Sequence, residues 1–252
     1  MAESTNPTAL AFSNALPAPT VGDNVRTPIR GTRYGEIVTY PLFGSKLYEA
    51  AQEGSYFVAT NATLGTAIAG KAAPTTLADT AALMFLRNDG ANNRQIMLDY
   101  ILLMVAAAGT NGTDWQFSMQ GDAGASRFTS GGTNITPVNP NMASANTPGL
   151  DGGVIRFGDL TIAAATSAAR ILHHGLVRTV IKVVGDKYLF KFGDSSPGVI
   201  SGIPLEGTTQ ASINIPCPPV VLGPGQSFLF REVATAQSVA ASYQLTMGFV
   251  VR

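Results

Sequence analysis

The chain has 252 residues, of which 45% are hydrophobic and 13% are charged, about half the charged share of an average soluble domain. Its 16 basic and 16 acidic residues cancel, which argues against a nucleic-acid-binding protein, because such a protein needs a basic face to displace counterions from phosphates. A chain with few charges and no net charge tends to associate. We therefore expect much of its surface to be buried against other subunits.

No targeting or membrane-spanning segment is predicted. The chain opens MAESTNPTAL, without the basic and then apolar stretches of a signal peptide. The most apolar stretch, residues 96–108, contains Asp99 and is too short to span a bilayer. We therefore expect a protein that is made in a cytoplasm, makes no membrane contact, and stays soluble or assembles.

Three regions follow one another along the chain. Residues 1–31 are rich in Ser, Thr, Asn, Pro and Ala without a hydrophobic period, which predicts a flexible or partner-ordered N-terminal arm. Residues 32–75 carry many aromatic residues broken up by proline and glycine, which indicates a β-containing arm segment and a connector. Residues 76–252 are expected to form the main domain.

The main domain shows the period-2 alternation of strands with one buried face. In residues 114–120 the apolar side chains are Trp115, Phe117 and Met119, and polar residues stand between them. Similar patterns, together with runs that are apolar on both faces, predict further strands at residues 81–86, 94–105, 154–162, 176–184, 187–192, 210–215, 226–233 and 243–251. Residues 163–170 are predicted to form at most one turn of helix.

About eight strands separated by turn signals predict an all-β antiparallel sandwich or barrel. Two long loops are expected, at residues 121–153 and 193–207. The first is too long for an idle hairpin turn, and loops of that length are usually functional, interfacial or disordered.

The only cysteine, Cys217, lies in NIPCPPVVLGPGQSFLF (residues 214–230) with a proline on each side. No basic residue stands near it in sequence to lower its pKa, so we interpret it as structural rather than reactive. The neighbouring prolines cannot donate ladder hydrogen bonds and mark a strand margin, while Gly223-Pro224-Gly225 predicts a turn. We expect Cys217→Ser to leave assembly intact and Gly225→Val to damage it.

The two histidines, His173 and His174, are adjacent, so on a strand they point to opposite faces and do not chelate one ion easily. We interpret them as one core and one surface residue; ligands from several subunits meeting on a symmetry axis are the alternative. Acidic residues are sparse and mostly sit in turn contexts, where aspartate caps local backbone. These residues are Asp89, Asp122, Asp151, Asp186 and Asp194.

Neither a G-x-S-x-G elbow nor a phosphate-binding glycine loop is present. The sequence therefore predicts no catalytic, cofactor-binding or metal site, and a protein that is not an enzyme. Arg26, Arg30 and Arg33 form the only basic cluster; they indicate either a contact with an acidic neighbour or nucleic acid, or a solvated stretch.

Three stretches resemble jelly-roll virion proteins of tailed bacteriophages. The first is the C-terminal NIPCPPVVLGPGQSFLFREVATAQSVAASYQLTMGFVVR, with its Pro-Pro strand and L-G-P-G-Q turn. The others are TAALMFLRNDGANNRQIMLDYILLMV, similar to the opening strand pair of these proteins, and TRYGEIVTYPLFGSKLYEAAQEGSYFVATN, similar to the segment that precedes their jelly roll.

The resemblance implies a jelly roll over residues 76–252 and a structural role in the particle. Its leading interpretation is a homotrimeric capsid cement or decoration protein on the capsid exterior, assembled in the host cytoplasm, whose partner is the major capsid protein. The alternatives are a tail, baseplate or receptor-binding jelly-roll module, a jelly-roll capsid shell protein, and an enzyme of the cupin or hydrolase type.

Overall fold

The computed structural model describes residues 46–61, 63, 65–71, 78–89, 94–123, 127–149, 155–178, 181–193 and 210–252. The chain divides into two compact units, residues 1–49 and 50–252, and the described strands all belong to the second. This unit begins inside the predicted 32–75 segment, because that segment supplies two strands, β1 and β2, to a sheet. The predicted arm, residues 1–31, lies outside the described residues.

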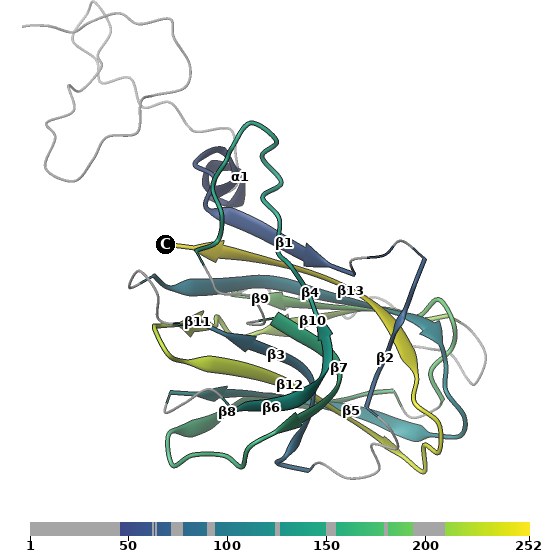
Figure 1. The fold of residues 1–252 in the computed structure, drawn as a ribbon. Helices are drawn as coiled ribbons and strands as arrows, with labels where there is room; N and C mark the ends of the chain where they lie inside the picture. The colour runs from purple at the N-terminus through teal and green to yellow at the C-terminus, as the bar shows by residue number, and fades with distance from the viewer. Residues whose placement is uncertain are drawn as a thin grey trace, which may run out of the picture. The chain divides into compact units, whose positions relative to one another are not determined.

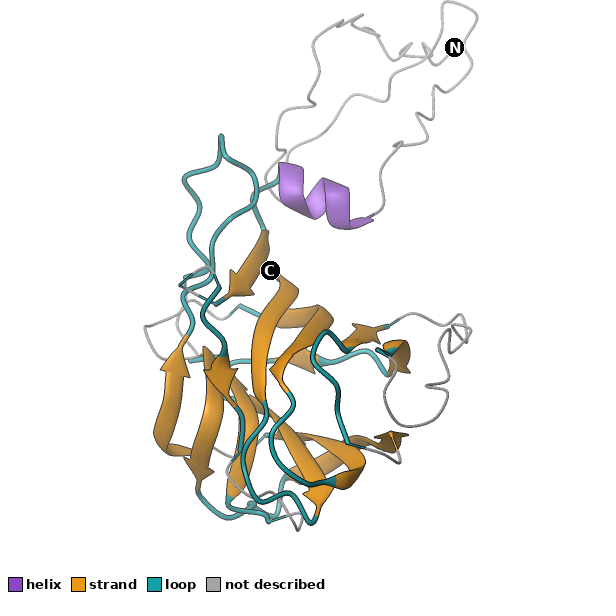
Figure 2. Cartoon of the chain, turned by 90° about the vertical axis from the view of Figure 1, so that its right-hand side faces the viewer, coloured by secondary structure: helices purple, strands orange, loops and turns teal. Residues whose placement is uncertain are grey.

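Strands make up most of the described chain (Figure 2), and they form two sheets that lie one above the other in Figure 1. One sheet contains β1 (Tyr56–Thr60), β2 (Ile68–Ala69), β4 (Ile96–Ala107), β9 (Lys187–Phe192), β10 (Ser212–Cys217), β11 (Val221–Leu222) and β13 (Ser242–Val251). The other contains β3 (Ala81–Arg87), β5 (Thr113–Asp122), β6 (Phe128–Asn134), β7 (Ile155–Ile162), β8 (Ala169–Arg178) and β12 (Ser227–Thr235).

The strand order brings distant parts of the sequence together. It is β1-β13-β4-β9-β10 in the seven-stranded sheet, with β2 on β13 and β11 on β4, and β6-β7-β3-β12-β5-β8 in the six-stranded sheet. The chain changes sheet between β2 and β3, between β3 and β4, between β4 and β5, between β8 and β9, and again on either side of β12. The pairings are antiparallel except between β9 and β10. The predicted all-β sandwich is therefore confirmed.

The core lies between the sheets and is built on aromatic rings. Phe117 of β5 stacks on Phe230 of β12 with ring centroids 5.9 Å apart, and Phe190 of β9 meets the two edge-on at 4.9 and 5.0 Å. The predicted inward residues of these strands are buried, as are those of β13. Alternation with period 2 thus identified the core face correctly, since each of these strands has one face toward the other sheet.

The outer face of the six-stranded sheet is covered by the chain itself. Phe128, at the start of β6, packs on a second buried cluster formed by Ala82, Phe85, Leu160, Ile162 and Leu229. This cover explains why β3 is apolar on both faces, as predicted. It also explains why β12 is buried on both faces, although its sequence predicted only one buried face. The predicted 121–153 loop is wrong in part, because it contains β6; the letters FTSGGTN carry no apolar alternation that would reveal a strand.

Two further predictions are wrong. The strand expected at residues 176–184 is β8, which spans Ala169–Arg178, so the predicted helical turn at 163–170 is absent and a single tight turn at Thr166–Ala169 replaces it. Asp186 lies directly before β9 and accepts a hydrogen bond from the Val183 backbone at 2.8 Å. Helix α1 (Lys46–Gln52) was also not predicted, because seven residues are too few to show a helical period.

Candidate functional site

Cys217 lies at the end of β10, an edge strand of the seven-stranded sheet, and is buried. Burial raises the pKa of its thiol to about 12, and its sulfur contacts the Ile215 carbonyl oxygen at 3.5 Å. A thiol with this pKa is protonated at neutral pH and is neither a nucleophile nor a metal ligand. Its position therefore fits the structural interpretation of the sequence.

The two histidines lie on β8, the edge strand of the six-stranded sheet. His173 is half-buried against the Phe117 ring, 5.2 Å between centroids, and His174 is exposed. Burial, and then the charge of His174, lower the pKa of His173. Within the described residues, no group of three or more His, Cys, Asp and Glu side chains could hold a metal ion.

A polar cluster lies in the core, where an apolar interior would be the rule. Lys182 and Glu232 are both almost fully buried, and the lysine Nζ lies 3.2 Å from Glu232 Oε2. The same carboxylate accepts hydrogen bonds from Trp115 Nε1 at 3.0 Å and from the Tyr243 hydroxyl. The lysine also donates to the Tyr243 oxygen at 2.6 Å.

Aromatic surroundings complete this cluster. The ammonium of Lys182 stands 5.2 Å from the Trp115 ring centroid and 5.3 Å from that of Tyr243. Burial lowers the pKa of Lys182, against the opposing effect of Glu232, and burial together with Glu232 raises the pKa of Tyr243 well above its usual range. Paired charges that are enclosed in this way join the two sheets, since the cluster draws on β5, β12 and β13.

A second polar cluster fixes the loops at one end of the six-stranded sheet. The buried guanidinium of Arg127 donates to Gln120 Oε1 at 2.7 Å and to the Ala163 carbonyl oxygen at 3.0 Å. Arg231 donates to the same Gln120 oxygen, and both arginines reach Asp79, at 3.1 and 2.8 Å. Burial acts to raise the pKa of Asp79, but hydrogen bonds from the Ala165 backbone and Arg127 outweigh it, so this pKa is lowered.

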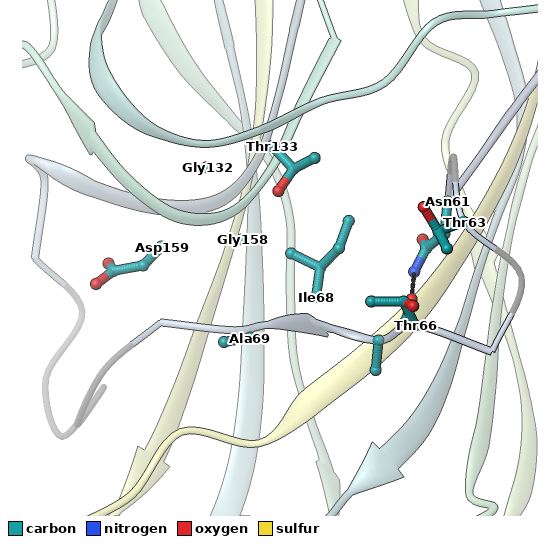
Figure 3. A pocket seen from close by; sticks show the side chains of 10 residues that line it. Asn61, Thr63, Thr66, Ile68, Ala69, Gly132, Thr133, Gly158 and Asp159 are labelled. Atoms are coloured by element: carbon teal, nitrogen blue, oxygen red, sulfur yellow. Dashed lines mark hydrogen bonds between the residues drawn. The ribbon is translucent and has the colours of Figure 1, made fainter.

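A surface hollow of about 440 Å³ lies between the strand β2 and the β6–β7 pair (Figure 3). Two of its polar side chains are already engaged: Asp159 pairs with Lys71, and Asn61 donates to the Thr66 carbonyl oxygen at 2.9 Å and accepts from the Leu245 backbone at 2.9 Å. The described lining holds no histidine, cysteine or aromatic side chain. It therefore offers neither a proton relay nor a stacking surface for a sugar ring.

The other sequence candidates are spread over the molecule. Trp115 points into the core as predicted. Asp122 and Asp186 are buried and accept backbone hydrogen bonds, from Thr166 and from Val183 and Ala211, as capping aspartates do. Arg26, Arg30, Arg33, Asp151 and Asp194 lie outside the described residues.

The sequence interpretation missed the Lys182–Glu232 pair. Glu232 could have been found, because it continues the period-2 face of Phe228 and Phe230 and so had to point inward. Lys182 stands in irregular chain, where no period indicates the direction of a side chain.

No helix of the described residues is long and apolar enough to cross a membrane. No protein-family model matches the chain, and neither curated proteins nor solved structures match it.

Proposed function

We propose that this chain is a non-enzymatic structural protein of a tailed-phage virion: a homotrimer that cements the capsid exterior by binding across seams between major capsid subunits. The observation that carries the proposal is the strand order. The path β1-β13-β4-β9 in one sheet faces β3-β12-β5-β8 in the other, and these interleaved orders are those expected of an eight-stranded jelly roll. The sequence stretches that resemble phage jelly-roll proteins supply five of these eight strands, β1, β3, β4, β12 and β13, in full or nearly so.

One fold can serve many functions, so the proposal needs support besides the strand order. Composition and the buried clusters supply it. The chain has few charges and no net charge, which favours association with other subunits over a monomer with a well-solvated surface. Lys182 and Glu232 are enclosed and paired, and the enclosed Arg127 is paired with the half-exposed Asp79, an arrangement that stiffens a scaffold.

The mechanism we infer is burial of surface area. A cement protein makes a modest contact with each shell subunit, and a standard contact buries about 1,600 Å² in total. Because a trimer offers three copies of the same contact, its three weak attachments act together as one strong attachment. This mechanism requires no cofactor, metal or small-molecule substrate.

The test is to locate the chain in virions of the phage that carries its gene, with gold-labelled antibodies raised against the purified protein. We expect label over the capsid surface of intact particles. Particles without label would contradict the proposal, and label only on opened shells would favour a shell protein.

One observation favours a second candidate, a receptor-binding module of the tail. The hollow beside β2 is rimmed by hydroxyls and by the Asp159 carboxylate, groups that hydrogen-bond sugars. Label confined to the tail, together with binding on a glycan array, would replace the cement proposal with this one.

A further inference from the structure

We propose that copies of this chain associate through the outer face of the seven-stranded sheet, centred on β4. This inference rests on the proposed function only in that it assigns a surface to the self-association of the homo-oligomer.

The outward side chains of β4 break the alternation expected of a solvated antiparallel sheet, which is apolar inside and polar outside. Four large side chains on this outer side are only half-buried: Met97, Tyr100, Leu102 and Met104. Leu102 pairs across the ladder with Leu189 of β9, another half-buried apolar residue. Together these five residues form an apolar stripe, which we call the β4 stripe.

Polar residues flank the β4 stripe on both sides. On β13, Gln244 and Thr246 stand opposite Met104 and Leu102. On β10, Ser212 and Asn214 occupy the corresponding outer positions. An apolar centre that includes methionine and tyrosine, inside a polar rim, is the usual anatomy of a protein–protein interface.

The two outer faces of the sandwich differ in what covers them. On the six-stranded sheet, Phe128 and the Arg127 cluster cover the outward side chains of the inner strands with the chain's own residues, while Ile171 and Leu176 of the edge strand β8 stay exposed. Among the described residues, no corresponding hydrophobic cluster lies over the β4 stripe. The apolar sequence of residues 94–105 predicted a central strand or a strand covered on the outside. β4 is central in its sheet, and the half-buried stripe is the place where another molecule would add the cover.

Gly248 leaves room for two tyrosine side chains at the stripe. A Cβ atom at this position would lie 2.1 Å from the Tyr56 hydroxyl and 2.5 Å from Tyr100 Cε1. Without that atom the two tyrosines lie close over β13, and the Tyr56 hydroxyl donates to Asp99 at 2.8 Å. A second copy therefore meets aromatic surface over β13, beside an Asp99 carboxylate that already accepts a hydrogen bond from Tyr56.

Area and charge both favour a second copy as the occupant. Five strands that average about eight residues cover about 600 Å² before side-chain relief is counted. That approaches the roughly 800 Å² that each partner contributes to a standard interface. Asp99 and Lys191 give the face both signs of charge, and the chain has no net charge, so two copies do not repel each other at long range.

The experiment is sedimentation equilibrium of the full chain and three variants over a range of concentrations, with thermal unfolding of each. Leu102→Lys places a charge in the middle of the β4 stripe, and we expect at least a tenfold loss of self-association. Thr246→Arg adds bulk and charge beside Leu102 without removing an apolar contact, and we expect the same direction of change. Leu176→Lys is the matched control, because Leu176 is exposed on β8 of the other sheet; its mass should equal that of the unchanged chain.

A monomeric unchanged chain, or unchanged mass in both stripe variants, would overturn this inference. Its failure differs from failure of the cement proposal. Labelled capsids together with unchanged variants would mean that the function stands and the surface is wrong. Dissociated variants together with unlabelled virions would mean that the association surface is correct and the cement function is wrong.

Discussion

Lys182 Nζ lies 3.2 Å from Glu232 Oε2 in the interior of the sandwich, and both side chains are almost fully removed from solvent. Removing one partner of such a pair leaves an uncompensated buried charge, which typically costs about 3–5 kcal/mol. We therefore expect Lys182→Met and Glu232→Gln each to lower the free energy of unfolding by about that amount, as measured by urea denaturation.

The double variant Lys182→Met/Glu232→Gln is the control for this prediction. It removes both charges while the amide oxygen still accepts from Trp115, so its loss should be clearly smaller than the sum of the two single losses. Additive losses would show that the pair is not coupled.

Arg127 is expected to be irreplaceable by lysine. Its guanidinium reaches Gln120, Ala163 and Asp79 at the same time, and one ammonium cannot reproduce this planar set of donors. Arg127→Lys should cost about 2–4 kcal/mol, because buried acceptors lose their partners. The comparison is Arg252→Lys, whose side chain is largely exposed and which should change the urea midpoint little.

The Cys217 thiol should be inert in the folded protein. With its pKa raised to about 12 by burial, almost none of it is thiolate at pH 8. A disulfide reagent such as dithionitrobenzoate should react with one thiol per chain only after denaturation. Rapid reaction of the native protein would contradict the burial of Cys217. Cys217→Ser is expected to retain the oligomeric mass of the unchanged chain.

Stability should fall as the pH drops below about 6.5, in part because of His173. The pKa of His173 is lower in the folded protein than in the unfolded chain, owing to burial beside Phe117. The unfolded chain therefore binds this proton first as the pH falls through the unfolded value of about 6.5, and proton uptake favours unfolding. His173→Gln should flatten the fall of the urea midpoint between pH 7 and pH 5, whereas His174→Gln, at an exposed position, should leave most of it.

Two glycines with positive φ should differ in their tolerance of a side chain. Gly225, in the turn before β12, has φ +76° and open space around a Cβ, so Gly225→Ala should cost only the backbone strain of about 1–2 kcal/mol. Gly131 in β6 has φ +87°, and a Cβ there would lie 2.3 Å from the Asp159 carbonyl oxygen. Gly131→Ala should therefore lower the thermal midpoint more than Gly225→Ala, and equal midpoints would refute this difference.

Valine at position 225 tests the prediction made from the sequence. A β-branched residue is strained further in this left-handed region, so Gly225→Val should reduce stability more than Gly225→Ala does. Oligomeric mass measured alongside stability separates damage to the turn from damage to assembly.

The class of the fold and the inward face of its strands could be predicted from the amino-acid sequence. Period-2 alternation correctly predicted the buried positions, because every second side chain of a strand points to the same face of the sheet. These buried residues are Trp115, Phe117, Tyr188, Phe190 and Phe230. Glu232 was readable in the same way, although its charge disguised it. The capping role of Asp186 was also readable, since aspartate commonly binds nearby backbone.

The order of the strands and the segments that cover them depend on contacts between distant parts of the chain. β6 is a strand because β7 supplies its hydrogen bonds, and nothing in FTSGGTN records that pairing. Lys182 meets Glu232 across 50 residues, and Arg127 meets Asp79 across 48, contacts that no local pattern encodes. Both faces of β4 carry apolar residues, so its sequence does not show which face is buried. The pairing of β4 with β13 and β9 shows that Leu103 faces the core and Leu102 faces outward. Local sequence determines which side chains are apolar, but the pairing of distant strands determines which other residues bury them.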